Sequence, residues 1–273
     1  DVNQCNEPDI KNESLNRFVK NIASPVNSMN GNNLPVSAFL PYVDGSIPLG
    51  SAAYEKRSTA SFVPCWEPEN CIQCNLCSYV CPHAVIRPVV TSSEEILNTP
   101  AEFKSKKMIG FPDYNFTIAI SVEDCTGCGN CAEICPGMKG KKALEMKEHS
   151  ESQQQTFEYS QNVSLKPEIF NKFKETTIKG SQFKKPLLEF SGACAGCGET
   201  PYAKLATQLF GDKMIIANAT GCSSIWGASF PSTPYTTTLD GKGPAWHNSL
   251  FEDNAEFGYG ISLAQKYLRN HII

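Results

Sequence analysis

Two cysteine runs of identical spacing constrain this chain more than any other feature. Each run has the form Cys-x2-Cys-x2-Cys-x3-Cys and is followed directly by proline. The eight cysteines are Cys71, Cys74, Cys77, Cys81, Cys125, Cys128, Cys131 and Cys135. Thiolates are soft ligands, and this repeated spacing is the bacterial-type signature of two [4Fe–4S] clusters. The runs therefore predict a domain that folds around two clusters.

The same spacing predicts how the thiols are shared between the clusters. The first three cysteines of a run bind one cluster, and the fourth reaches across to the other. We expect one cluster to be held by Cys71, Cys74, Cys77 and Cys135. We expect the second to be held by Cys125, Cys128, Cys131 and Cys81. This crossed pairing ties the two segments together and makes the clusters neighbours, as one-electron transfer requires.

Composition excludes several other classes of protein. The chain has 273 residues, of which 41% are hydrophobic and 19% charged, and this is enough for about two globular domains. A net charge of −4 and the lack of a long basic run give no case for a nucleic-acid partner. No apolar stretch approaches the roughly 20 residues that span a bilayer, and no signal peptide is visible. The 13 cysteines follow metal-ligand spacing rather than a disulfide framework, which favours a reducing compartment.

Residue patterns divide the chain into three segments. Residues 1–50 are rich in Asn, Pro and Ser and are interpreted as a linker or small connecting domain. One helix is expected over 10–22, with Leu15, Phe18, Val19 and Ile22 on one face, and the Pro-containing stretch 23–50 is expected to be irregular. Residues 51–166 are expected to form an α+β, ferredoxin-like domain with two clusters. Within it we expect a strand over 116–122 and a polar surface connection over 145–161.

Residues 167–273 change to an α/β pattern. A helix is predicted over 201–210 with Tyr202, Leu205, Ala206 and Leu209 on its apolar face, and the short apolar run 214–219 is typical of a buried parallel strand. A further helix is expected after Asn254. The chain starts at Asp1 rather than Met and stops within that helical pattern, so we interpret it as a fragment of a longer polypeptide.

A third group of cysteines lies in this last segment. Cys194 and Cys197 form a C-x2-C pair, and Cys222 follows the predicted strand, where ligands of open α/β sheets bind. A lone C-x2-C suits zinc, a redox dithiol or a cluster. A fourth ligand could be Cys5, Cys65 or a residue beyond the chain.

Three longer motifs resemble one enzyme family. They are the Cys-x2-Cys-Gly-Glu-Thr-Pro-Tyr-Ala-Lys motif in 194–204, Ile-Ala-Asn-Ala-Thr-Gly-Cys-Ser-Ser-Ile-Trp-Gly at 216–227, and the Gly-Pro-Ala-Trp segment that continues to 258. Together with Glu55-Lys-Arg and the sequence around the first cysteine run, they closely resemble the pyruvate:ferredoxin (flavodoxin) oxidoreductases. The similarity covers residues 30–273.

The resemblance implies an activity and a set of cofactors. These large, homodimeric, cytoplasmic enzymes (hydrogenosomal in some anaerobic protists) decarboxylate pyruvate oxidatively to acetyl-CoA and CO2. They use thiamine diphosphate with Mg2+ and three [4Fe–4S] clusters, and they reduce ferredoxin or flavodoxin. By the same resemblance the last segment would be the start of a thiamine-diphosphate-binding domain with a parallel sheet.

The resemblance also assigns residues. Cys194, Cys197 and Cys222 would bind the third cluster, completed by a cysteine downstream of this chain, and Glu199 and Cys222 would contact the thiamine. The family's Gly-Asp-Gly motif is absent here, and its pyruvate and CoA segments lie upstream, so no catalytic residue is assigned in this chain. His83 is interpreted as a packing or surface residue.

Three alternatives stay open from the sequence. One is the pyruvate:NADP variant of the enzyme, and another is an enzyme for a different 2-oxoacid. The third is a stand-alone two-cluster electron-transfer protein with a structural zinc at Cys194, Cys197 and Cys222. About eight irons with zinc would favour this last alternative, and about twelve irons would favour three clusters.

Overall fold

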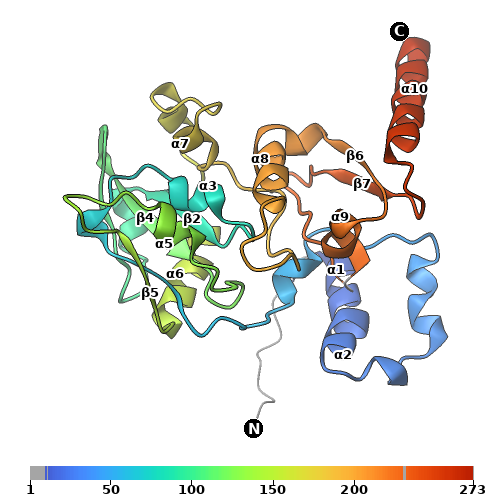
Figure 1. Ribbon diagram of the computed structural model, residues 1–273, viewed down its shortest axis with the longest axis horizontal. Helices are drawn as coiled ribbons and strands as arrows, with labels where there is room; N and C mark the ends of the chain where they lie inside the picture. Colours follow the sequence, from blue (N-terminus) through green and yellow to red (C-terminus); the bar gives the residue numbers. More distant parts are fainter. Residues whose placement is uncertain (1–9, 11, 230–231, 273) are drawn as a thin grey trace. The chain divides into compact units, whose positions relative to one another are not determined.

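A computed structural model describes residues 10, 12–229 and 232–272 (Figure 1). The chain forms two compact units. We call residues 56–212 the central unit, and residues 1–55 together with 213–273 the split unit. The domain boundaries expected from the sequence stay a prediction. Among the described residues, no helix combines the length and the apolar character needed to cross a membrane.

Two small antiparallel sheets organise the central unit. In one, β4 (Phe111–Ile120) lies between β2 (Ile86–Thr91) and β3 (Lys106–Met108). In the other, β1 (Val63–Trp66) pairs with β5 (Leu144–Lys147). Phe116 and Leu144 are fully buried, and the Trp66 ring packs edge-on against Phe116. The core of the unit therefore lies where the two sheets meet.

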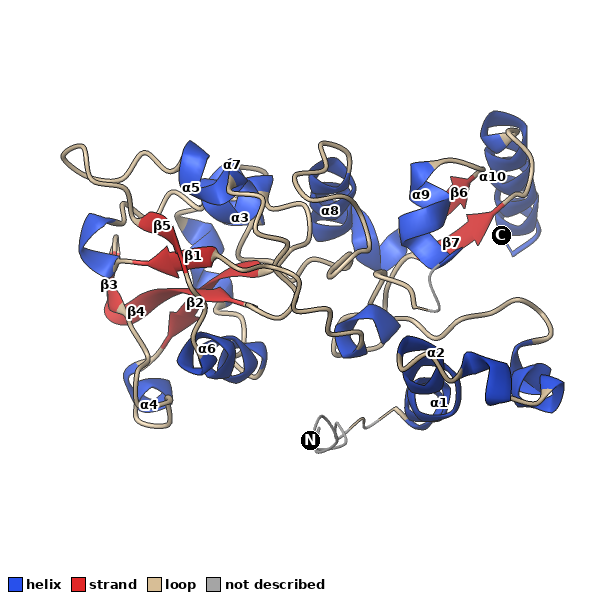
Figure 2. Ribbon diagram, turned by 60° about the horizontal axis from the view of Figure 1, so that its bottom comes forward, coloured by secondary structure: helices blue, strands red, loops and turns tan. Residues whose placement is uncertain are grey.

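Short helices cover the strands of the central unit. They are α3 (Leu76–Val80), α4 (Ser93–Ile96), α5 (Asn130–Ile134), α6 (Glu151–Gln161), α7 (Ile178–Ser181) and α8 (Thr200–Phe210). In Figure 2, α3, α5 and α7 lie on one side of the strands, and α4 and α6 lie on the other. The predicted strand over 116–122 is present as the second half of β4, and both of its faces are buried because α6 covers one of them.

The polar surface connection expected over 145–161 is wrong. The segment contains β5 and the 11-residue helix α6, which begins with a capping box between Ser150 and Gln153. Phe157 is 3% exposed, and the Gln154 side-chain oxygen accepts from the backbone N–H of Val122 at 3.0 Å. A mostly polar helix is buried here because its amide side chain satisfies backbone groups of the core.

The split unit begins with a continuous helical segment. It comprises α1 (Glu13–Phe18), a π-helical turn over Val19–Ala23 and α2 (Ser24–Asn27). The face predicted for this helix is confirmed, since Leu15, Phe18, Val19 and Ile22 are all buried. The segment that follows is less irregular than expected, because it forms 3-10 helices over Gly31–Asn33 and Val36–Tyr42.

The second part of the split unit has α/β character. Strand β6 (Ile215–Asn218) pairs in parallel with β7 (Ala245–Asn248), so the parallel strand predicted from the apolar run is present. The burial expected for it is wrong, since Ile215 is exposed and the other residues of β6 are half-buried in a described sheet of two strands. Helix α9 (Cys222–Ser224) and a π-helical turn (Ile225–Ser229) follow β6. The helix expected near the end is confirmed as α10 (Asn254–Ile272). Both units thus mix helices with sheets, antiparallel in one and parallel in the other.

Candidate functional site

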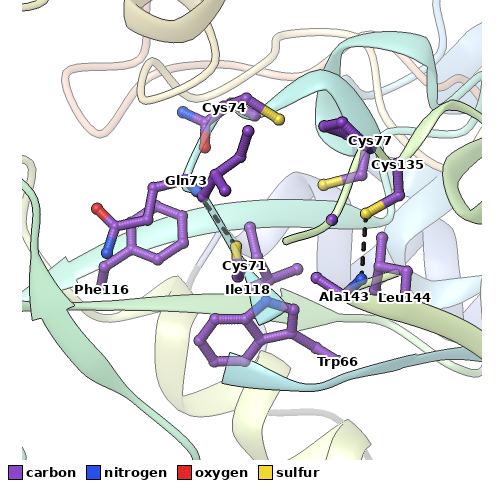
Figure 3. Close-up of a pocket in the computed structure, with 14 residues that line it drawn as sticks. Trp66, Cys71, Gln73, Cys74, Cys77, Phe116, Ile118, Cys135, Ala143 and Leu144 are labelled. Atoms are coloured by element: carbon purple, nitrogen blue, oxygen red, sulfur yellow. Dashed lines mark hydrogen bonds between the residues drawn. The ribbon is translucent and has the colours of Figure 1, made fainter. Parts of the chain in front are cut away.

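Four thiols from both cysteine runs line one pocket of the central unit, which we call site I. They are Cys71, Cys74, Cys77 and Cys135. Figure 3 shows Cys135 beside Cys77, with Cys71 above the Trp66 ring. Apolar side chains, including Phe116, Ile118 and Leu144, complete the wall. The structure therefore brings together the four cysteines that the spacing grouped, one of them from the other run.

A second pocket, site II, gathers the remaining four thiols of the runs. Its cysteines are Cys81, Cys125, Cys128 and Cys131. Here the exchange is reversed, because Cys81 comes from the first run and the other three from the second. Pro64, Val85 and Met146 provide apolar lining. The helices that carry Cys77 and Cys131, α3 and α5, pack against each other, so the two sites are neighbours.

The backbone makes the same turn in both runs. Gln73 and Gly127 have φ of 57° and 67°, and Asn75 and Gly129 have φ of 63° and 80°. These left-handed residues turn the chain around each pocket. As a result, the N–H of Gln73 points to Cys71 Sγ and that of Gly127 to Cys125 Sγ, each at 3.4 Å. The N–H of Ala143 donates to Cys135 Sγ at 3.3 Å.

The donor set fits an iron–sulfur cluster. Burial raises the pKa of the Cys125 thiol to about 12 and raises the pKa values of Cys71, Cys77 and Cys131, so a bare pocket disfavours thiolates. A cationic iron centre compensates that cost, and backbone N–H donors to sulfur stabilise the bound ligands. In the part of the chain that the structure describes, no three His, Cys, Asp or Glu side chains converge as closely as a single metal ion requires.

A buried lysine lies against α3, the helix that carries Cys77 of site I and is followed by Cys81 of site II. Lys204 of α8 is 1% exposed, and its Nζ donates to the carbonyls of Ser78, Tyr79 (3.0 Å) and Cys81 (3.2 Å) at the end of α3. Burial lowers the pKa of Lys204 to about 8, and the neighbouring Cys81 and Cys77 thiols oppose that shift.

Helix α8 faces the opposite way from the sequence prediction. Its buried residues are Thr200, Lys204, Thr207 and Gln208, whereas Tyr202, expected on the buried face, is 74% exposed. The polar stripe is buried because it bonds to backbone: Thr207 Oγ1 accepts from Leu187 N at 3.1 Å, and Gln208 donates to Lys184 O at 2.9 Å. Sequence reasoning missed Lys204, and the available signal was this polar stripe at helical spacing.

The C-x2-C pair lies beside site II. A backbone bond from Cys197 N to Cys194 O (3.0 Å) closes its turn. Gly196 in that turn is so near Cys128 that an added Cβ would be 3.6 Å from the Cys128 Cβ. His83 is 2% exposed and is therefore a packing residue. Its Nδ1 lies 2.9 Å from Ser191 O, in the segment that leads into this turn. Burial lowers the pKa of His83.

The other predicted residues are dispersed. Cys222 begins α9 in the split unit, directly after β6, and is exposed. Glu199 is exposed and precedes α8 in the central unit. Cys65 lies on β1 outside both four-thiol sites, and Cys5 falls outside the described residues. Cys194 and Cys197 thus share a turn, while Cys222 belongs to the other unit.

Comparison with known proteins defines the class of protein first. A family model described as a 4Fe-4S dicluster domain matches residues 70–138, which include both cysteine runs. A second, described as a domain of unknown function (EKR), matches residues 5–60. Together with sites I and II, the first match defines an iron–sulfur protein of the dicluster type.

Individual relatives narrow this class. The chain is 55% identical to the pyruvate-flavodoxin oxidoreductase of Enterobacter agglomerans over 260 residues, or 94% of this chain and 22% of that protein. It is 53% identical to the pyruvate:ferredoxin oxidoreductase of Moorella thermoacetica over 90% of the chain and 21% of the relative. For the mitochondrial pyruvate dehydrogenase [NADP(+)] of Euglena gracilis the identity is 49%, over 93% of the chain and 14% of the relative.

The resemblance found in the sequence motifs is confirmed. The chain corresponds to a segment of the pyruvate:ferredoxin (flavodoxin) oxidoreductases, which are oxidoreductase enzymes, and spans about a fifth of their length.

Proposed function

We propose that this chain supplies the electron-transfer segment of a pyruvate:ferredoxin or pyruvate:flavodoxin oxidoreductase. The overall reaction would convert pyruvate and coenzyme A to acetyl-CoA and CO2 and deliver two electrons, one at a time, to ferredoxin or flavodoxin. The observation that carries the proposal is the pair of neighbouring four-thiol sites in a chain 53–55% identical to such enzymes.

The residues of the central unit would hold and order the relay. When bound, [4Fe–4S] clusters supply one-electron transfer at potentials set by hydrogen bonds to sulfur and by solvent exposure. The eight cysteines of sites I and II would be their ligands. Because the Cys194–Cys197 turn lies beside Cys128 of site II, we propose that electrons enter through that turn and pass by site II to site I.

We further propose the assignments that link this chain to the catalytic centre. Cys194, Cys197 and Cys222 would hold a third cluster with a cysteine outside the chain, and Glu199 and Cys222 would contact thiamine diphosphate with its Mg2+. Support comes from the parallel pair of β6 and β7, since ligands bind beyond the carboxyl ends of such strands and Cys222 follows β6. The start of the thiamine-binding domain would then be residues 167–273.

Further assignments concern partners and location. Pyruvate and coenzyme A would bind on parts of the enzyme outside this chain, and the enzyme would be a homodimer of the cytoplasm. NADP is a second candidate acceptor, because relatives named pyruvate dehydrogenase [NADP(+)] are 49–50% identical to the chain. Reduction assays of the whole enzyme with ferredoxin, flavodoxin and NADP+ would separate these acceptors.

Metal analysis tests the proposal against the zinc alternative. About twelve irons with matching sulfide would support three clusters, whereas about eight irons with one zinc would favour the stand-alone protein. Cys197→Ala is expected to remove about four irons, and the matched control Cys65→Ala none. Loss of zinc from the Cys197→Ala protein, with its iron unchanged, would overturn the third-cluster assignment.

A further inference from the structure

Lys204 is a buried cation that no carboxylate of the described residues neutralises. Its ammonium bonds to three backbone carbonyls of the segment 78–81 and, among the described residues, forms no ion pair. Carbonyl dipoles at the end of a helix favour a cation but carry only partial charge. An ammonium that is 1% exposed would therefore lack a full counter-charge unless the surroundings supply one.

The position of this ammonium suggests what supplies the counter-charge. The segment that it caps connects Cys77, a thiol of site I, to Cys81, a thiol of site II. As thiolates, Cys81 and Cys77 would raise the pKa of Lys204, which burial lowers. A cluster bound by four thiolates is anionic, and it becomes more so when it accepts an electron. A cation buried against the segment that joins two such sites stabilises the reduced form of each, since the low dielectric strengthens the attraction.

We propose that Lys204 is a positioning residue whose buried charge raises the reduction potentials of both clusters of the dicluster domain. This inference rests on the proposed occupation of sites I and II. It adds to the proposed function because Lys204 lies on α8, the helix that follows the C-x2-C turn. The packing of this helix on α3 would therefore influence the potentials of both clusters.

Other cations near the sites differ from Lys204. Lys106 is half-buried and donates to the Cys71 carbonyl at 3.0 Å, so it lies by site I alone. Lys56 pairs with the buried Asp124 at 2.5 Å. Arg87 pairs with the buried Glu189 at 2.6 Å. Charge that is exposed or paired has little effect at a distance.

Lys142, which follows the second run, provides a matched comparison with Lys204. Its Nζ donates to the carbonyls of Ala132 (2.7 Å) and Glu133 (3.0 Å) at the end of α5, as Lys204 does for α3. However, the Lys142 side chain is 43% exposed and lies 3.5 Å from the Glu133 carboxylate. The two lysines thus cap equivalent helices, and they differ in burial and in neutralisation.

The test measures the midpoint potentials of the two clusters in the cluster-loaded protein by redox titration with electron paramagnetic resonance. Lys204→Gln retains an amide donor for the α3 carbonyls and removes the charge, and Lys204→Met removes both. In each variant we expect the equilibrium constant for one-electron reduction of each cluster to fall about tenfold, a shift of about 59 mV to more negative potential. Lys142→Met is expected to change it by less than about threefold.

Two outcomes would overturn the proposal. One is a Lys204→Gln protein with full iron content and potentials equal to those of Lys142→Met. The other is a Lys204→Gln protein that fails to retain its clusters, because the lysine would then act in assembly and not through its charge. Iron analysis of the unmodified protein keeps the tests separate. Absence of the two clusters there would refute the proposed function, whereas unchanged potentials in loaded variants would refute only the role of Lys204.

Discussion

The two cysteine runs share one ligand geometry but differ in how the rest of the central unit holds them. Both turn through two left-handed residues, Gln73 and Asn75 in one run and Gly127 and Gly129 in the other. Both aim a backbone N–H at their first sulfur from 3.4 Å. The local backbone around the thiols is thus repeated. The first run has Gln73 and Asn75, for which positive φ is unfavourable, where the second run has glycine.

The surroundings of the runs are not repeated. The first run is followed by the buried His83 and by Arg87, which forms a buried ion pair with Glu189. The second is followed by Gly137, whose tight turn returns the chain to Lys141 at the surface. The comparison teaches that ligand geometry is a local property of each run, whereas the segments that follow the runs are held differently, by a buried ion pair after the first and by a surface turn after the second.

The largest expected effect comes from removing one thiol and asking which cluster is lost. Cys81 belongs to the first run by position and to site II by structure. Cys81→Ala should therefore match Cys131→Ala, with the loss of about four irons and the same remaining paramagnetic signal. A remaining signal equal to that of Cys77→Ala would contradict the crossed pairing.

The next effect tests the anchoring of the first run. Glu189→Ala leaves Arg87, whose side chain is 9% exposed, without its partner, and we expect a loss of about 3–5 kcal/mol in the free energy of unfolding. Anaerobic denaturant unfolding of the cluster-loaded protein measures it. Glu133→Ala in the second run is the control: its side chain is 91% exposed, so the change should stay below about 1 kcal/mol. Equal losses of unfolding free energy in the two variants would contradict the proposed difference in anchoring.

A smaller effect tests the turn that ends the second run. Gly137 has φ of 60°, and an added Cβ would lie 1.9 Å from the Lys141 carbonyl oxygen. Gly137→Ala should cost about 2 kcal/mol or more, since the backbone must move in addition to the strain of positive φ. Gly140→Ala, with φ of 78° and no atom within 4 Å, should cost only the strain, about 1 kcal/mol. Denaturant midpoints of the two variants should differ accordingly.

The smallest expected effect lies in the segment that separates the runs. Glu95 closes the capping box of α4 and pairs with Lys166 at 2.6 Å. Burial raises its pKa, but Lys166 and Ser92 outweigh this and hold the pKa below its usual range. Glu95→Gln keeps the cap and removes the ion pair, so we expect a loss of about 0.5 kcal/mol.

The pH dependence of this loss has a definite sign. A lowered folded-state pKa contributes stability above the unfolded pKa of about 4.3, and that stability is lost as the pH falls through the folded value. The difference between Glu95→Gln and the unmodified protein should therefore be constant across neutral pH. Thermal unfolding at several pH values checks it, and a difference that grows as the pH rises through neutrality would contradict the assignment.

Much of the local structure could be predicted from the sequence. The apolar face of 10–22, the strand β6 and the helix α10 all follow from periodicity, because each is a pattern of neighbouring residues, although no described residue of β6 or α10 is buried. The segment 145–161 and the face of α8 could not be predicted in this way. Both bury polar side chains, Gln154 and Lys204, that satisfy carbonyl or N–H groups of segments remote in sequence.

The sequence alone determined the thiols of the dicluster domain and their crossed grouping. Three cysteines separated by two residues each can bind one cluster, and the fourth cysteine of the run reaches the other. Only the tertiary structure decided what surrounds those thiols. Lys204 reaches the Ser78 carbonyl across 126 residues of sequence, and that contact exists only because α8 packs its polar face on α3. The burial of the Lys204 ammonium and its position beside the cysteine segment follow from that packing. No pattern in the cysteine runs predicts them.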